Sequence, residues 1–218
     1  MSEPVRWKPN PIKEAIKLVA HGACIPFVLP VLIQYWLARP LFGPSRALEG
    51  ATQTLAGVPG AMGIYFRRAF LSFVLKRCSR SAEIGYGTLL SQPDSVIGDR
   101  VYIGPRCHLG LVNLEADVLL AAGVHVPSGA MTHHFDDPDV PIREQGGERQ
   151  LVTIGAGAWI GSGAIVLADV GAGTIVGAGS VVTKPLPANV IAAGAPAKVI
   201  RNRFPAPDET PKSNGENF

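Results

Sequence analysis

The sequence predicts a mainly β protein whose centre is a three-sided parallel coil of six-residue repeats. Aliphatic residues recur six apart in two sets between Val152 and Lys184, and small residues stand four positions after four of them. The aliphatic positions are Ile154, Ile160, Val166, Val170, Val176 and Val182, and the small ones are Ala158, Ala164, Thr174 and Ser180. A period of six fits neither an amphipathic helix nor an alternating strand. It fits a prism in which each flat face takes six residues.

The same phase appears earlier in the chain, so the coil is expected to span residues 81–187. The earlier aliphatic positions are Ile97, Ile103, Leu109, Leu114, Leu120 and Val126. The positions four residues later, which we expect to point inward, are Val101, Cys107, Asn113, Val118, Val124 and Ala130. The pattern vanishes between about Ala130 and Leu151. A long loop ejected from a regular stack usually has a functional reason, which makes residues 130–151 the expected active-site loop.

Residues 1–80 predict an apolar and basic helical region. Pro9 and Pro11 favour a helix that starts near Ile12. Residues 22–38 contain no charge but include two prolines, and three interpretations stay open. They form a helix packed on the coil or on a neighbouring subunit, a membrane-surface or re-entrant segment, or a true membrane span. A cleavable signal peptide is disfavoured, because the apolar stretch starts late and no A-x-A site follows it.

Residues 64–77 place Arg67, Arg68, Lys76 and Arg77 among apolar side chains. We expect a helix that covers the open end of the coil and shields its first rung. Contact with an anionic membrane surface is compatible with that role.

Beyond Lys184 the prolines at 185 and 187 end the prism. We expect a C-terminal extension over residues 188–203, with a short helix from about Pro196 to Arg203. Residues 204–218 are polar and contain proline, which predicts a disordered tail.

Composition excludes several classes of protein. The 218 residues carry a formal net charge of +3, too little to indicate nucleic-acid binding, and no nucleic-acid motif accompanies it. The three cysteines do not make a disulfide framework, and Cys107, at an inward repeat position, is interpreted as a core thiol. A reducing cytoplasm is the simplest compartment, with attachment to the inner face of the membrane as an addition.

Residues 97–203 resemble the hexapeptide-repeat acyltransferases, in the branch of the galactoside and maltose O-acetyltransferases and the nodulation acetyltransferases. Three blocks carry the resemblance in order: W-I-G-x-G-A, G-A-G-S-V-V-T-K and G-x-P-A-K-V-I. The resemblance implies a left-handed parallel β-helix, an exception to the usual right-handed crossover. It also implies a homotrimer that binds acetyl-coenzyme A in grooves between adjacent coils and needs no metal.

Acyl transfer to a hydroxyl requires a base with a pKa near the working pH and donors for the developing oxyanion. The resemblance places a catalytic histidine in the long loop, where His133 and His134 are both candidates. Loop residues that orient the imidazole or contact the acceptor would be Asp136, Asp137 and Glu144, although a solvated acidic loop explains them equally. Asn113 is either a marker of the rung beside the active site or a structural asparagine.

The resemblance also assigns residues to the acyl donor. Trp159 would flank the pantetheine arm, although an outward Trp is equally typical of an interface. Gly161, Ala178 and Gly179 would let backbone amides approach that arm. The adenine and phosphates would be met at the far end of the coil by Thr183, Lys184, Lys198 and Arg201, with lysine acting as a point charge.

The acceptor suggested by the resemblance is a sugar hydroxyl, and the apolar N-terminal third favours a lipid-linked or cell-surface glycan precursor. One rival is a carbonic-anhydrase-like metalloenzyme with three histidines around zinc. His108 and His125 are 17 apart and could stack on adjacent rungs, with His133 as the third ligand. Their position before repeat aliphatics favours turn residues that face solvent. The second rival is a non-catalytic scaffold, which would not need the ejected loop.

Overall fold

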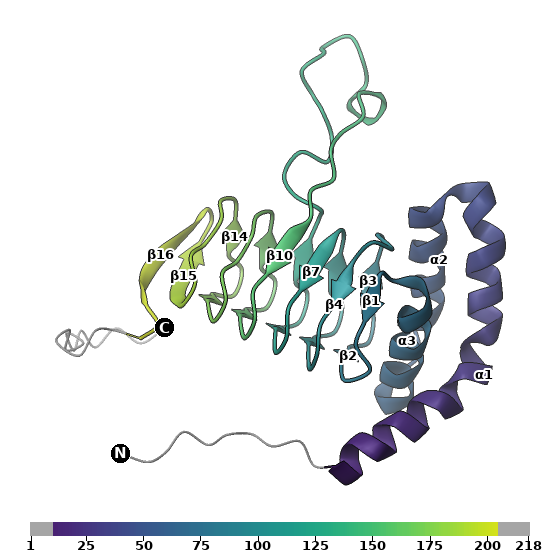
Figure 1. Ribbon diagram of the computed structural model, residues 1–218. Helices are drawn as coiled ribbons and strands as arrows, with labels where there is room; N and C mark the ends of the chain where they lie inside the picture. Colours follow the sequence, from purple (N-terminus) through teal and green to yellow (C-terminus); the bar gives the residue numbers. More distant parts are fainter. Residues whose placement is uncertain (1–10, 205–218) are drawn as a thin grey trace, which may run out of the picture.

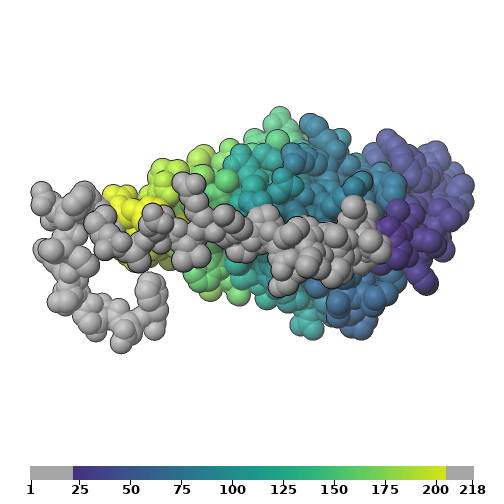
Figure 2. All heavy atoms as spheres, turned by 60° about the horizontal axis from the view of Figure 1, so that its bottom comes forward, coloured from purple at the N-terminus to yellow at the C-terminus, as the bar shows by residue number. Residues whose placement is uncertain are grey.

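The computed structural model describes residues 11–204, in which three helices are followed by a parallel β-coil (Figure 1). The helices are α1 (Pro11–Phe42), α2 (Pro44–Ala56) and α3 (Gly60–Val74). They lie together at one end of an elongated molecule, and the C-terminal strands lie at the other (Figure 2). The tail predicted for residues 204–218 falls almost wholly outside the described residues, as do the first ten positions.

The strands form three sheets, which we call faces A, B and C. Face A contains β1 (Arg77–Cys78), β4 (Val96–Ile97), β7 (Val112–Leu114) and β10 (Val152–Ile154). Face B contains β2 (Glu83–Ile84), β5 (Tyr102–Ile103), β8 (Leu119–Leu120), β11 (Trp159–Ile160), β13 (Ile175–Val176), β15 (Val190–Gly194) and β16 (Ala197–Asn202). Face C contains β3 (Leu89–Leu90), β6 (His108–Leu109), β9 (His125–Val126), β12 (Ile165–Val166) and β14 (Val181–Val182). Apart from β15 and β16, neighbouring strands pair in parallel, which confirms the predicted β-helix and is consistent with left-handed winding.

The predicted six-residue phase describes the interior of the coil. All twelve repeat aliphatics from Ile97 to Val182 are at most 2% exposed. The small positions Ala158, Ala164, Thr174 and Ser180 are buried as well. Each coil therefore buries its aliphatics against the coils above and below it, as expected for a solenoid.

Two of the predicted inward positions are wrong. Asn113 is the middle residue of β7, between the buried Val112 and Leu114, and so points outward. Side chains alternate between the two sides of a strand, so the neighbours of an outward residue point inward. Because five residues rather than six separate Leu109 from Leu114, the inward position falls at Val112 instead of Asn113. Ala130 is exposed, and Ser128 is the buried residue at that corner.

The helical cap predicted at the N-terminal end is confirmed, and it bonds to the first coil through buried arginines. Because the first coil donates its N–H groups to the second coil, its own carbonyl groups face the helices. Arg67 Nε donates to Ile84 O at 2.9 Å, and Arg68 Nη1 donates to Ala82 O at 3.3 Å. These side chains are only 3% and 1% exposed, so neither is available to a membrane surface.

Helix α1 packs one side against the other two helices. Cys24, Val28 and Tyr35 are buried, and the Tyr35 and Phe70 rings meet edge to face with centroids 6.1 Å apart. The prolines predicted to interrupt this segment lie inside a continuous helix, which is bent in Figure 1. Pro removes one backbone hydrogen bond and kinks a helix without necessarily ending it.

Among the described residues, one stretch, Gly22–Phe42, is long and apolar enough to cross a membrane by length and composition. Core helices and signal sequences meet the same criterion, and 22% of the stretch is buried within the protein. Its outer side exposes Ile33, Trp36 and Leu37.

The C-terminal helix predicted from about Pro196 to Arg203 is wrong. These residues form β16, which pairs antiparallel with β15 from Gly194↔Ala197 to Val190↔Asn202. β-Branched Val199 and Ile200 favour a strand, and the free edge of β15 offers the hydrogen-bonding partner. The strand thus covers the last coil on face B.

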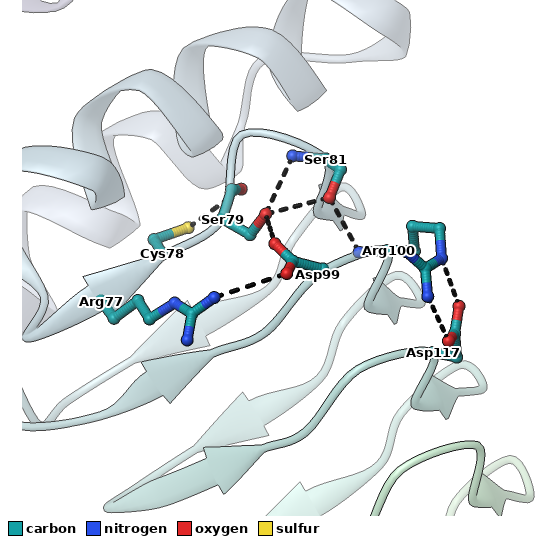
Figure 3. A network of polar contacts seen from close by, with 7 residues as sticks. All are labelled: Arg77, Cys78, Ser79, Ser81, Asp99, Arg100 and Asp117. Carbon is teal, nitrogen blue, oxygen red and sulfur yellow. Dashed lines mark hydrogen bonds and ion pairs between the residues drawn. The ribbon is translucent and has the colours of Figure 1, made fainter. Parts of the chain in front are cut away.

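Exposed ion pairs link successive coils near the cap (Figure 3). Arg77 lies 3.4 Å from Asp99, and the Arg100 guanidinium binds both carboxylate oxygens of Asp117. Ser79 Oγ donates to Asp99 Oδ1 at 2.5 Å. Exposed pairs of this kind contribute about 0–1 kcal/mol each, so we assign them a supporting structural role.

Candidate functional site

The predicted loop leaves the coil after β9 and returns at β10, and it projects far from the coil in Figure 1. Its two arms pair near the base: Gln150 N donates to Ser128 O at 2.8 Å, and Glu148 N donates to Met131 O at 2.7 Å. Gly147 is required here, because a Cβ at this residue would overlap Thr132 O. The base of the loop is therefore a paired ribbon that holds its first residues against face C.

A cavity of about 450 Å³ lies where this ribbon, face C and α2 meet. Volumes of roughly 300–1,000 Å³ are typical of small-molecule sites. Its walls come from the first turns of α2, from β3 and β6, from the end of β9 and from both arms of the loop. The polar and charged side chains among its lining are Ser45, Arg46, Glu49, Ser91, Gln92, His108, His125, Ser128, Thr132, His133 and Arg149.

Three imidazoles reach this cavity. His108 and His125 are register partners on β6 and β9, and their ring centroids are 5.6 Å apart. Burial lowers the pKa of His125, and the charge of His108 lowers it further. His133 comes to the same cavity from the loop. The strands thus supply two rigidly placed imidazoles and the loop supplies the third.

The two loop histidines predicted as alternatives have different surroundings. His133 is exposed and lines the cavity, whereas His134 is half-buried outside the lining. His134 N donates to Gly146 O at 3.1 Å, which places it in the paired part of the loop. In the single chain, therefore, His133 is the loop histidine that reaches the cavity.

The predicted acceptor contacts do not reach the cavity in this chain. Asp136, Asp137 and Glu144 are exposed in the outer part of the loop, where Glu144 pairs with Arg143 and the Gln145 amide binds Asp137 O. Asn113 lies on face A and does not line the cavity either. Among the described residues, no hydrogen bond joins these side chains to a histidine.

The residues predicted to contact an acyl donor lie on the later coils. Trp159 points outward as predicted and is 48% exposed. Thr183, Lys184, Lys198 and Arg201 are all exposed at the C-terminal end. They form a polar, cationic end of the coil, well separated along the chain and along the coil from the cavity beside α2.

The glycines predicted to approach the donor have a structural reason to be glycine. A Cβ at Gly161 would lie 2.5 Å from Ala178 N, so the close stacking of coils excludes a side chain there. The N–H groups of Gly161 and Gly179 donate to Val176 O and Ser162 O. These two amides are thus used within the coil.

Cys107 and Cys78 are enclosed by protein, and no cluster of metal-ligand side chains is found among residues 11–204. Cys107 is fully buried, as predicted, and burial raises the pKa of its thiol. Cys78 is also surrounded by protein, which raises its pKa to about 12. His108 and His125 do stack on adjacent rungs, but the described residues contain no group of three His, Cys, Asp or Glu side chains arranged to hold a metal ion.

Sequence reasoning missed several residues that line the cavity. Except in the metalloenzyme alternative, His108 and His125 were predicted to be turn residues that face solvent. The 17-residue spacing was the signal that they stack. Arg46 and Arg149 carried no motif, because the cavity joins a helix and a loop that are about a hundred residues apart in the sequence.

Comparison with known proteins supports the class of fold. No protein-family profile matches the sequence, and no curated protein matches it significantly. Solved structures of acetyltransferases do match the architecture described above.

One match is a maltose O-acetyltransferase from Clostridium difficile 630, with a TM-score of 0.61 and 21% sequence identity over 72% of this chain and 87% of that chain. Another is a galactoside acetyltransferase in complex with coenzyme A, with a TM-score of 0.57 and 23% identity over 73% of this chain and 82% of that chain. At these identities the similarity establishes a shared fold.

Proposed function

We propose that this protein is an acyl-coenzyme-A-dependent O-acyltransferase that transfers an acetyl group to a sugar hydroxyl. The observation that carries the proposal is the position of His133, at the base of an ejected loop and open to a cavity beside a β-coil. The coil is shared with a maltose O-acetyltransferase and with a galactoside acetyltransferase that binds coenzyme A. Those two enzymes support the proposed reaction class, and the cavity offers a place for it.

In the proposed reaction the donor supplies an acyl thioester, whose C–S bond breaks as the acceptor oxygen forms the new C–O bond. His133 accepts the proton of the attacking hydroxyl and returns it to the departing thiolate, so that the products are the ester and the free thiol. Backbone N–H groups at the coil turns would hold the developing oxyanion. His134 is the alternative base.

The decisive experiment compares His133→Ala with the matched variant His134→Ala in an assay of thiol release from acetyl-coenzyme A. We expect a loss of turnover of about 100-fold or more for His133→Ala, the size typical of a lost general base. His134→Ala should retain most of its activity. The opposite ranking would move the role to His134, and full activity in both variants would overturn the mechanism.

For the donor, we propose that Trp159 and the cationic end of the coil bind coenzyme A. Lys184 and Lys198 are exposed point charges suited to phosphate, and Thr183 and Arg201 are exposed beside them in sequence. Trp159, Ala178, Gly161 and Gly179 lie on the coils that would flank the pantetheine arm. The donor is a substrate, and the proposed reaction uses no metal.

We further propose a homotrimer held in part by face B. Outward residues Tyr102, Leu119 and Trp159 are register neighbours and are each at least 40% exposed. An exposed apolar stripe of this kind is typical of a subunit interface. Sedimentation of wild type and of Leu119→Lys tests the stripe, because a buried lysine should dissociate the trimer.

The outer side of α1 favours an acceptor presented at a membrane, such as a lipid-linked glycan precursor in the cytoplasm. Ile33, Trp36 and Leu37 are exposed there, and Arg39 lies over the Trp36 ring at 5.1 Å. Because the opposite side of α1 is packed on α3, we propose that it lies in the membrane surface rather than across it. Of the basic residues in 64–77, only Lys76 and Arg77 remain exposed for such contact. Flotation with anionic vesicles tests this, with Trp36→Ser as the weakened variant.

A further inference from the structure

The cavity beside α2 has a pronounced charge bias. Arg46 enters from the first turn of α2, and Arg149 enters from the returning arm of the loop. Neither guanidinium makes an ion pair or a side-chain hydrogen bond with a described residue. Glu49 is the one carboxylate of the lining. When the imidazoles are neutral, the lining therefore carries two positive charges and one negative charge.

The helix that carries Arg46 adds positive potential at its first turn. The first turn of α2 contains no acidic residue, although the peptide dipoles of a helix place partial positive charge at that end. The Arg143 guanidinium, by contrast, is already paired with Glu144 at 3.0 Å in the outer loop. Ser45 Oγ donates to Gln92 Oε1 at 3.1 Å, which ties α2 to the coil and fixes one wall of the cavity.

The remaining lining is suited to a carbohydrate. Hydroxyl and amide groups of Ser91, Gln92 and Thr132 can exchange hydrogen bonds with sugar hydroxyls, and the imidazoles can act as donors or acceptors. Guanidinium groups bind phosphate and carboxylate through paired N–H donors. The cavity thus combines a neutral polar wall with two cationic arms.

We infer that the cavity binds a sugar that carries an anionic group, held by Arg46 and Arg149 while a hydroxyl is presented to His133. This inference rests on the proposed function for the identity of the reaction, but it makes a separate claim about recognition. The anionic group is a phosphate or a carboxylate.

The test measures binding without a donor, by calorimetry on the full chain at low salt. The probes are glucose 1-phosphate, glucuronate and glucose, which separate phosphate, carboxylate and neutral sugars. We expect at least one anionic probe to bind about tenfold or more tightly than glucose. Arg46→Gln and Arg149→Gln should each remove about 3- to 10-fold of that preference, and Arg149→Lys should restore part of it, because charge-assisted contacts depend on charge and geometry.

Arg80→Gln is the control, because Arg80 is exposed and lies outside the cavity. It should leave the preference unchanged, and thermal melting should show all four variants folded. Equal binding of the three probes, or an anion preference unaffected by both glutamine variants, would overturn the inference. His133→Ala should keep the binding preference. If anionic sugars bind as expected and no acetyl transfer to them occurs in wild type, the proposed reaction fails while the binding site stands.

Discussion

At its N-terminal end the coil is covered by helices whose contact faces are buried, whereas at its C-terminal end it is covered by an exposed antiparallel strand. The helical end binds the free carbonyl groups of the first coil through Arg67 and Arg68. At the other end Arg203 Nη1 donates to Gly173 O at 2.8 Å from a half-buried position. Both ends thus use arginine to complete the hydrogen bonding of a coil, and at the N-terminal end α2 also forms one wall of the cavity beside face C.

The largest effect should come from Arg67→Met. Arg67 donates to Ile84 O, Leu55 O and Val58 O, and a thioether leaves these carbonyls without a donor. We expect the free energy of unfolding to fall by about 3 kcal/mol, a typical sum for several buried polar groups left unpaired. Urea titration at a fixed protein concentration measures it.

Arg203→Met is the counterpart at the other end. Its single hydrogen bond is partly solvated, so we expect a loss of about 1 kcal/mol or less. An equal loss of unfolding free energy in Arg67→Met and Arg203→Met would contradict this prediction, because burial would then not distinguish the two ends of the coil.

The next largest effect should be on substrate binding, because we propose that the donor and the acceptor bind at opposite ends of the coil. Lys184→Gln combined with Lys198→Gln should raise the KM for acetyl-coenzyme A about tenfold, because the two exposed charges proposed to bind its phosphates are lost. The kcat should change little, since neither residue lines the cavity. Steady-state kinetics with the donor and the acceptor varied in turn measures both constants.

Arg46→Gln should have the reverse profile, with a raised KM for the acceptor and an unchanged KM for the donor. If the lysine pair altered the acceptor KM instead, the assignment of donor and acceptor to opposite ends would be incorrect.

The coil was predictable because its physics is local and repeated. Each six-residue unit requires a branched aliphatic at a corner and a small residue at the next, as at Ile154 and Ala158, so the phase is written in the sequence. The ejected loop was equally visible as the place where the phase stops. Asn113 was misplaced because a one-residue deletion changes which side of the strand points inward.

The cavity was not predictable, because it depends on contacts between distant segments. Nothing near Arg46 or Arg149 in the sequence indicates that a helix and a loop meet over face C. The arginines of α3 were ambiguous for a related reason: Arg67 and Arg68 beside phenylalanines fit a membrane-facing helix as well as a buried cap. The carbonyl groups of the first coil decide between these two interpretations, because they accept hydrogen bonds from both arginines. Only the fold brings these carbonyl groups next to α3. The C-terminal helix failed because the open edge of β15 outweighed local propensity.

The smallest expected effect is a pH dependence that originates in the strand-borne imidazoles. Burial and the charge of His108 lower the pKa of His125 in the folded protein relative to the unfolded chain. The unfolded state therefore binds more protons as pH falls through the ordinary histidine range near 6.5, and folding becomes less favourable there. His125→Gln removes this penalty. Its melting temperature relative to wild type should accordingly be higher at pH 5 than at pH 8, whatever the offset between the two proteins at pH 8.

His108→Gln sharpens the test, because it removes only the second of the two causes and should reduce the pH dependence in part. A difference between wild type and His125→Gln that stays constant from pH 8 to pH 5 would show that this imidazole takes up its proton equally well in both states. The paired histidines would then be ordinary surface residues, and the cavity would depend on His133 alone for its imidazole chemistry. If the difference in melting temperature changes with pH as expected, the result would instead support a neutral His125 near pH 7. In that form it can accept a hydrogen bond from a sugar hydroxyl beside the base.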